Sequence, residues 1–143
     1  MATIAELAQM SADVYNGTQS SDQPNPPALL TGLSSDWSVV TTSAAAPGGS
    51  TYWSQGYFAV VYRNSLTGEI VIANRGTSDV NGATLLQNLL SDRALAANTT
   101  PTVDLDAQAF AKYVITQVLP KDGIGSISDL IETGHSLGGS EAQ

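Results

Sequence analysis

The stretch Asp129-Leu-Ile-Glu-Thr-Gly-His-Ser-Leu-Gly-Gly-Ser140 decides which fold we expect for this chain. It begins with a short apolar run, breaks at Gly134, and leaves through Gly138 and Gly139 into a helix-like tail. Gly134 to Gly138 fit the pattern G-x-S-x-G, in which a serine, here Ser136, lies on a tight turn between a strand and a helix. The small residues on either side let the strand and the helix approach each other. The pattern therefore predicts an exposed serine hydroxyl beside the first amides of a helix.

A second interpretation of this stretch is purely structural and assigns no catalytic role to Ser136. A glycine-rich loop after a strand has the same composition, and Ser136 would then only cap the following helix. The bare pattern is weak, since a random match in a chain of this length is expected about one time in twenty. Its context favours the functional turn, because an apolar run of β type precedes it and Gly139 adds a further glycine.

Two upstream blocks support the functional interpretation. Ile70-Val-Ile-Ala-Asn-Arg-Gly-Thr77 reads as a core strand that ends in Arg-Gly-Thr, and Asn88-Leu-Leu-Ser-Asp92 follows it. Together with residues 134–139, these blocks resemble the α/β-hydrolase lipases, in particular the class 3 lipases, over roughly Gly56 to Gln143. The resemblance implies an α/β fold, namely the N-terminal portion of an α/β-hydrolase-like mixed, mainly parallel sheet with flanking helices.

The resemblance also implies roles for single residues. Ser136 would be the nucleophile that forms an acyl-enzyme during hydrolysis of a lipid or another acyl ester. The backbone N–H of Leu137 would bind the oxyanion together with Thr77, through its backbone N–H and its hydroxyl. Arg75 would anchor the Arg-Gly-Thr loop, and Asp92 would stiffen it. For Thr77, Arg75 and Asp92 the alternatives are a strand-end turn hydroxyl, a surface arginine and a solvated helix acid.

His135 is the only histidine of the sequence, and we do not expect it to be the base for Ser136. Adjacent side chains on a strand point to opposite faces, so a packing or hydrogen-bonding role beside the turn is the better interpretation. In α/β-hydrolases the triad acid and histidine follow the serine, whereas the residues after Ser136 contain Glu141 and no histidine. We therefore expect residues 1–143 to be a single unit, the N-terminal part of a hydrolase domain truncated just after the turn. A missing C-terminal half or a partner chain would complete it.

Two other functions remain open at this point. A phospholipase A1-type acyl hydrolase would use the same serine and the same oxyanion donors on a phospholipid. A non-catalytic interaction module could instead retain the turn without a base. A continuation that carries an aspartate and a histidine would favour an enzyme, and a stop codon after Gln143 would favour the module.

The composition of the chain argues against several classes of partner and cofactor. The net charge is −8, from 13 acidic against 5 basic residues, so no basic patch is available for nucleic acid. The absence of cysteine excludes disulfides and thiolate metal sites, and one histidine argues against zinc. We expect no cofactor, since serine-based ester hydrolysis needs none.

The first residues lack the features of a secretory signal, and no apolar stretch is long enough to span a bilayer. By resemblance we expect a secreted protein, with the cytoplasm as the alternative.

Hydrophobic periodicity and turn residues predict the remaining elements. We expect helices over residues 4–15, 84–97 and 104–119, strands over residues 37–43, 56–63 and 69–74, a loop over 16–35 and a break over 44–50. A capping box formed by Thr3 and Glu6 should open the first helix, and Gly68 should supply positive φ in a hairpin loop. The buried stripes should include Ile4 in the first helix and Leu105 in the last. The order strand, helix, strand predicts that the strand ending at residue 74 pairs in parallel with the one ending at residue 134.

Overall fold

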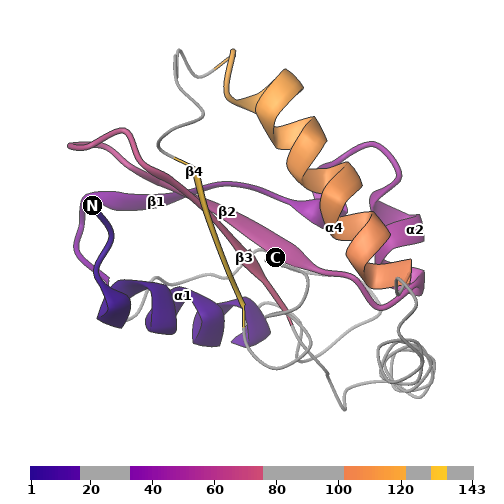
Figure 1. Ribbon diagram of the computed structural model, residues 1–143, viewed down its shortest axis with the longest axis horizontal. Helices are drawn as coiled ribbons and strands as arrows, with labels where there is room; N and C mark the ends of the chain where they lie inside the picture. The colour runs from indigo at the N-terminus through magenta and orange to yellow at the C-terminus, as the bar shows by residue number, and fades with distance from the viewer. Residues whose placement is uncertain (17–32, 76–101, 122–129, 135–143) are drawn as a thin grey trace.

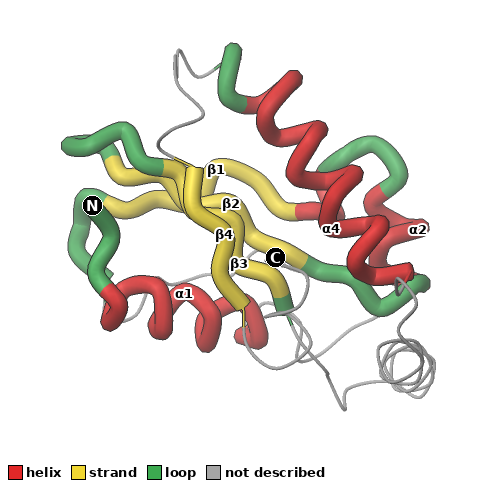
Figure 2. The backbone as a smooth tube through the Cα atoms, in the orientation of Figure 1, coloured by secondary structure: helices red, strands yellow, loops and turns green. Residues whose placement is uncertain are grey.

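Among the residues that the structure describes, four strands form one mixed sheet that has helices on both faces (Figure 1). The computed structural model describes residues 1–16, 33–75, 102–121 and 130–134. In chain order the elements are α1 (Ile4–Asn16), β1 (Trp37–Thr42), the 3-10 turn η1 (Ser43–Ala45), α2 (Gly49–Ser54), β2 (Ala59–Asn64), β3 (Ile70–Asn74), α4 (Thr102–Tyr113), the π-helical turn η2 (Val114–Val118) and β4 (Leu130–Gly134). Figure 2 shows α1 on one side of the sheet and α2 and α4 on the other. The architecture is therefore a general α/β one.

The strand order in the sheet is β1-β2-β3-β4. β1 pairs with β2 and β2 pairs with β3 in antiparallel fashion, whereas β3 and β4 are parallel, from Ile70 opposite Leu130 to Asn74 opposite Gly134. The predicted parallel pairing and the mixed character of the sheet are confirmed. Parallel pairing does not predominate among the described strands, because the short connection between β2 and β3 permits only a hairpin.

The hairpin between β2 and β3 has the predicted loop chemistry. Asn64 Oδ1 accepts hydrogen bonds from the backbone N–H groups of Leu66 (2.9 Å) and Thr67 (3.0 Å), and Asn64 N donates to Glu69 O at 2.9 Å. Gly68 has a φ of +77°, a conformation that favours glycine. The loop fixes the register of the two central strands, and with it the level at which β3 ends.

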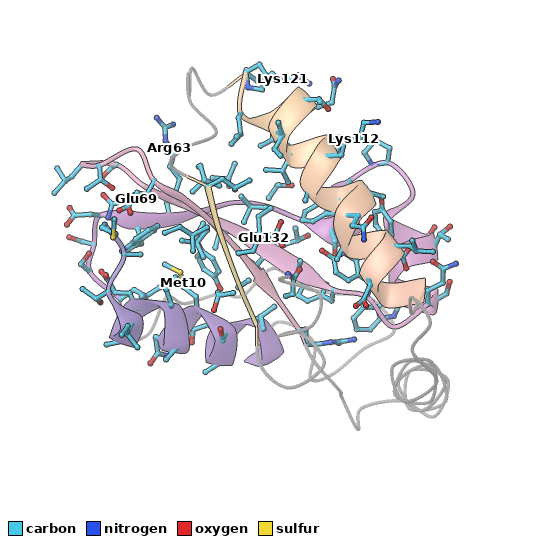
Figure 3. All side chains as sticks on the ribbon, in the orientation of Figure 1. Met10, Arg63, Glu69, Lys112, Lys121 and Glu132 are labelled. Atoms are coloured by element: carbon cyan, nitrogen blue, oxygen red, sulfur yellow. The ribbon has the colours of Figure 1, made fainter. Side chains whose placement is uncertain are left out.

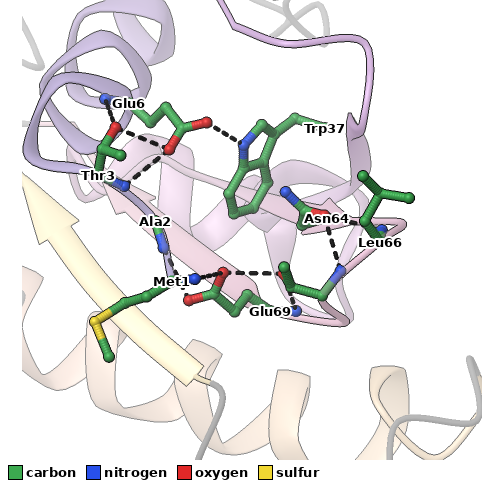
Figure 4. A network of polar contacts seen from close by, with 9 residues as sticks. Met1, Ala2, Thr3, Glu6, Trp37, Asn64, Leu66 and Glu69 are labelled. Carbon is green, nitrogen blue, oxygen red and sulfur yellow. Dashed lines mark hydrogen bonds and ion pairs between the residues drawn. The ribbon is translucent and has the colours of Figure 1, made fainter.

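The predicted capping box at the start of α1 is also confirmed. Thr3 N donates to Glu6 Oε2 at 2.8 Å, and Glu6 N donates to Thr3 Oγ1 at 3.2 Å. Glu6 Oε1 accepts a further hydrogen bond of 2.9 Å from the indole Nε1 of Trp37, at the first residue of β1 (Figure 4). The backbone hydrogen bond from Thr3, followed by the bond from Trp37, holds the pKa of Glu6 below its usual value. One side chain therefore ties the helix start to the sheet.

Alternate residues of the strands fill two separate cores. The core under α1 contains Met10, Val14, Trp37, Phe58, Val60, Tyr62, Val71 and Ala73, and Figure 3 shows Met10 between α1 and the sheet. The core under α4 contains Ala46, Tyr57, Ala59, Val61, Ile70, Ile72, Ala107, Phe110, Val114 and Leu119. The central strands β2 and β3 are thus covered on both faces, as their continuous apolar runs indicate.

Two predicted core residues are wrong. Ile4 is 88% exposed and Leu105 is 53% exposed. Ile4 is the first residue of α1, whose contacts with the core begin at the partly buried Leu7. Successive helical residues are rotated by about 100°, which places Leu105 on the side of α4 opposite its buried stripe. The buried residues are Met10, Ser11, Asp13 and Val14 in α1 and Ala107, Phe110 and Val114 in the last helix.

Several element boundaries also differ from the prediction. The expected break over residues 44–50 contains η1 and the start of α2, and Ser43 belongs to η1, where its Oγ accepts a hydrogen bond of 3.0 Å from Ala59 N. Gly49 permits this compact segment, because a Cβ there would collide with the carbonyl oxygen of Ala44. The last helix follows its predicted course into η2, and Pro120 comes after it. The predicted helix over 84–97 and most of the predicted loop over 16–35 lie outside the described residues.

Candidate active site

The carboxyl ends of β3 and β4 lie next to each other. Asn74, the last residue of β3, is the register partner of Gly134, the last residue of β4, and neighbouring strands in a sheet are about 4.8 Å apart. Of the site residues predicted from the sequence, the structure describes Arg75 and Gly134. The others, Thr77, Asp92, His135, Ser136, Leu137 and Gly138, lie outside the described residues. The structure therefore brings together the two strands that precede the Arg-Gly-Thr and G-x-S-x-G segments.

Arg75 is a buried anchor, which rules out the alternative of a surface arginine. It is 1% exposed, and its backbone N–H donates to Phe58 O at 2.9 Å. Its Nη2 donates to Gly56 O at 3.2 Å, and its Cζ lies 4.9 Å from the ring centroid of Trp53 and 5.8 Å from that of Phe58. A guanidinium over aromatic faces is attracted by their quadrupoles. Arg75 thus fastens the end of β3 to α2 and to the connection that leads into β2.

Asn74 is a second buried polar residue at this edge, and the sequence interpretation assigned it no role. It is 1% exposed, and its Oδ1 accepts a hydrogen bond of 2.9 Å from the hydroxyl of Tyr57. Its Nδ2 is buried without a hydrogen-bond partner in the described part of the chain. Leaving a buried donor unsatisfied costs about 1–3 kcal/mol. The signal in the sequence is an asparagine that ends an otherwise apolar core strand.

An aromatic cluster holds Tyr57 in place on the α4 face of the sheet. The ring of Tyr57 lies 5.7 Å from that of Tyr52 and 6.1 Å from that of Phe110, and the rings of Tyr52 and Phe110 are 6.3 Å apart, all in edge-to-face arrangements. Edge-to-face pairs of this kind are favourable beyond the area that they bury. The hydroxyl that orients the Asn74 amide is therefore fixed by packing from both α2 and α4.

Asp106 adds an acidic group beside this cluster. It is half-buried, and burial raises its pKa to about 6. Burial and the charge of Asp106 raise the pKa of Tyr52. With the Gln55 amide turned so that its oxygen and nitrogen exchange places, Nε2 lies 2.7 Å from Oδ2 and 2.9 Å from Oδ1 of Asp106. That contact favours the carboxylate and opposes the effect of burial.

Glu132 is the second acidic group on the α4 face. It is the register partner of Ile72 on β3, and it lies two residues before Gly134 (Figure 3). The side chain is half-buried, and burial raises its pKa. Because alternate residues of β4 share a face, Glu132 lies on the same side as Leu130, which packs against the core under α4. This side of the sheet therefore has acidic neighbours on both β4 and α4.

The described residues contain no group of three or more histidine, cysteine, aspartate or glutamate side chains that could hold a metal ion. No helix in the same residues is long and apolar enough to cross a membrane. The chain matches no protein-family model, no curated protein and no solved structure.

Proposed function

We propose that the protein is a serine carboxylic ester hydrolase of the α/β-hydrolase type, similar to class 3 lipases, with Ser136 as its nucleophile. One observation carries the proposal: β3 and β4 are parallel neighbours that end at the same level, with Asn74 opposite Gly134. In open α/β sheets ligands bind at the carboxyl ends of such strands. The Arg-Gly-Thr segment directly follows Asn74 in the sequence, and the G-x-S-x-G segment begins at Gly134.

The proposed reaction proceeds through an acyl-enzyme. Ser136 Oγ forms a bond to the ester carbonyl carbon while a general base takes its proton. The negative charge on the carbonyl oxygen is stabilised by hydrogen bonds from Thr77 and from the backbone N–H of Leu137. The alcohol leaves with the proton, and water then releases the acid by the same route.

The base in this proposal is a histidine that is not His135. His135 directly precedes Ser136, and adjacent side chains of an extended segment point to opposite faces. It is the only histidine among these 143 residues. The proposal therefore assigns the triad histidine and its acid to residues outside them, either on the same polypeptide or on a partner. Substrates are lipids or other acyl esters, and the reaction uses no cofactor.

The burial of Arg75 supports this proposal independently of the strand register. A loop that supplies an oxyanion donor must be held rigidly, because electrostatic stabilisation of a transition state depends on donors that are already in place. The hydrogen bond to Gly56 and the rings of Trp53 and Phe58 hold the residue that leads into Thr77.

Hydrolysis of 4-nitrophenyl esters tests the proposal. The protein from its natural source, with any chain that accompanies it, should hydrolyse short-chain and medium-chain esters, and Ser136→Ala should abolish turnover. Ser140→Ala is the matched control, because Ser140 belongs to the same sequence stretch but lies outside the pattern. Turnover that survives Ser136→Ala would overturn the proposal. Absence of turnover in the natural protein would favour a binding module.

A further inference from the structure

The contact between the helices α2 and α4 includes a polar pair, Gln55 and Asp106. Gln55 is the residue at which α2 ends, and its side-chain amide faces the Asp106 carboxyl of α4. With its nitrogen on that side, the amide lies 2.7 Å from Oδ2 and 2.9 Å from Oδ1. Both side chains are half-buried. The protonation state of Asp106 therefore affects the contact between the two helices.

The two protonation states of Asp106 need opposite orientations of the Gln55 amide. A carboxylate only accepts hydrogen bonds, so the amide nitrogen has to face it, whereas a protonated carboxyl can donate to the amide oxygen. A half-turn of the amide exchanges nitrogen and oxygen at the same position, so a hydrogen bond is possible in each state. The bond to the carboxylate is charge-assisted and is the stronger of the two.

Burial acts against the charged state of Asp106. In the described part of the chain no cation forms an ion pair with it, and Lys112, six residues later on α4, is exposed. Tyr52 on α2 interacts with Asp106 electrostatically but is neutral at neutral pH, because its pKa is raised. Asp104, two residues earlier on α4, and Glu132, on the α4 face of β4, are acids themselves. Burial therefore raises the pKa of Asp106 to about 6, so its charge changes close to neutral pH.

The helix α2 depends on side-chain contacts for its order. It has six residues, and helices shorter than about 12 residues are marginal in water on their own. Tyr52 packs against Tyr57 and Phe110, and the ring of Trp53 contacts the guanidinium of Arg75. A change at the contact with α4 therefore affects how firmly α2 is held against the sheet.

We propose that the Gln55–Asp106 contact is a proton-sensitive device that holds α2 against α4 while the carboxyl is protonated and weakens when the carboxyl becomes charged. When the contact opens, water solvates the carboxylate, so loss of the proton favours the open form. The closed form binds the proton more tightly than the open form. Its stabilising effect is therefore complete below the usual pKa of about 4 and is lost as the pH rises through about 6. The inference is independent of the proposed ester hydrolysis.

Hydrogen exchange of backbone amides at α2 tests the proposal in the full protein, with any chain that accompanies it. Gln55 N donates to Thr51 O at 3.0 Å, and Tyr57 N donates to Tyr52 O at 2.9 Å, so both amides exchange when α2 opens. Each rate is divided by the rate in Asp106→Asn at the same pH, which cancels the intrinsic pH dependence of exchange. We expect this ratio to rise by about fivefold between about pH 5 and pH 8.

The amide of Met10 in the buried part of α1 is the control, and its ratio should stay constant over the same range. An equal rise at Met10 would mean that the whole protein opens rather than α2, and would overturn the proposal. A rise smaller than about twofold at the α2 amides would overturn it as well.

Side-chain amide NMR of the wild type keeps the test decisive if Asp106→Asn does not fold. The NH₂ signals of Gln55 should shift with the same midpoint as the Asp106 carboxyl signal, near pH 6, because the amide turns as the proton leaves. Gln108, which is exposed on α4, is the matched control, and its NH₂ signals should not move in this range. Gln55 signals that stay constant while Asp106 titrates would contradict the proposal.

Discussion

Asn74 and Gly134 are opposite each other at the carboxyl end of the parallel ladder between β3 and β4. The two residues are far apart in the sequence, and each ends a strand that leads into one half of the proposed active site. The proposed chemistry depends on this relation, because a nucleophile and its oxyanion donors must share one edge of the sheet.

Replacing Arg75 should destabilise the protein. We expect Arg75→Lys to lower the free energy of unfolding by about 2 kcal/mol, because lysine lacks the planar guanidinium that contacts Trp53 and Phe58. Urea denaturation measures this change. Arg63→Lys on β2, at a partly exposed side chain, is the control, with an expected change within about 0.5 kcal/mol. Equal effects of the two substitutions would show that Arg75 is no anchor.

The aromatic cluster makes a prediction about α4. Phe110→Ala should lower the free energy of unfolding by about 3–5 kcal/mol, because the ring is fully buried against Tyr52 and Tyr57. Leu105→Ala, at a side chain that is 53% exposed on the same helix, should change it by less than about 0.5 kcal/mol. Thermal unfolding of both variants provides the comparison. A larger loss at Leu105 would mean that the helix is rotated relative to the sheet.

The capping box links stability to pH. Hydrogen bonds from Thr3 and Trp37 lower the pKa of Glu6 in the folded protein. Its contribution to stability is therefore present above the unfolded pKa of about 4.5 and is lost as the pH falls through the folded value. Thr3→Ala should lower the free energy of unfolding by about 1 kcal/mol at neutral pH and by less in acid. Urea titrations at several pH values test this, and a loss independent of pH would contradict it.

The effect of Asp106 on the pH dependence of stability should be opposite to that of Glu6. Burial raises its pKa to about 6, so the protonated form is favoured in the folded state and stability decreases as the pH rises toward that value. Asp106→Asn should remove this decrease, and the Gln55 amide remains able to hydrogen-bond to the introduced side chain. Carboxyl NMR measures the midpoint directly. A midpoint near the usual value of about 4 would show that the hydrogen bonds from Gln55 outweigh burial.

Local patterns predicted the parts of the fold that local interactions determine. The Thr3–Glu6 capping box, the Gly68 hairpin loop and the parallel pairing of the last strand all follow from neighbouring residues or from chain order. The position of Leu105 was wrong because periodicity alone does not fix how a helix is rotated against a sheet. That of Ile4 was wrong because periodicity does not show at which residue the contact between helix and sheet begins.

The candidate site was predicted less completely, because burial of polar groups depends on contacts between distant segments. Arg75 was recognised in its motif, but its guanidinium packs on the α2 residue Trp53, in a segment for which we had predicted no element. Asn74 was missed because its burial and its hydrogen bond depend on Tyr57, which comes from another segment of the chain. Thr77, Asp92 and residues 135–138 lie outside the described residues, so their roles remain predictions.

The most direct test of the central claim is reaction with a fluorophosphonate ester, followed by intact-mass measurement and peptide mapping. We predict a single adduct on Ser136 in the protein from its natural source, with no adduct in the Ser136→Ala variant. Reaction at another residue, or an unlabelled natural protein, would contradict the assignment of Ser136 as an activated nucleophile.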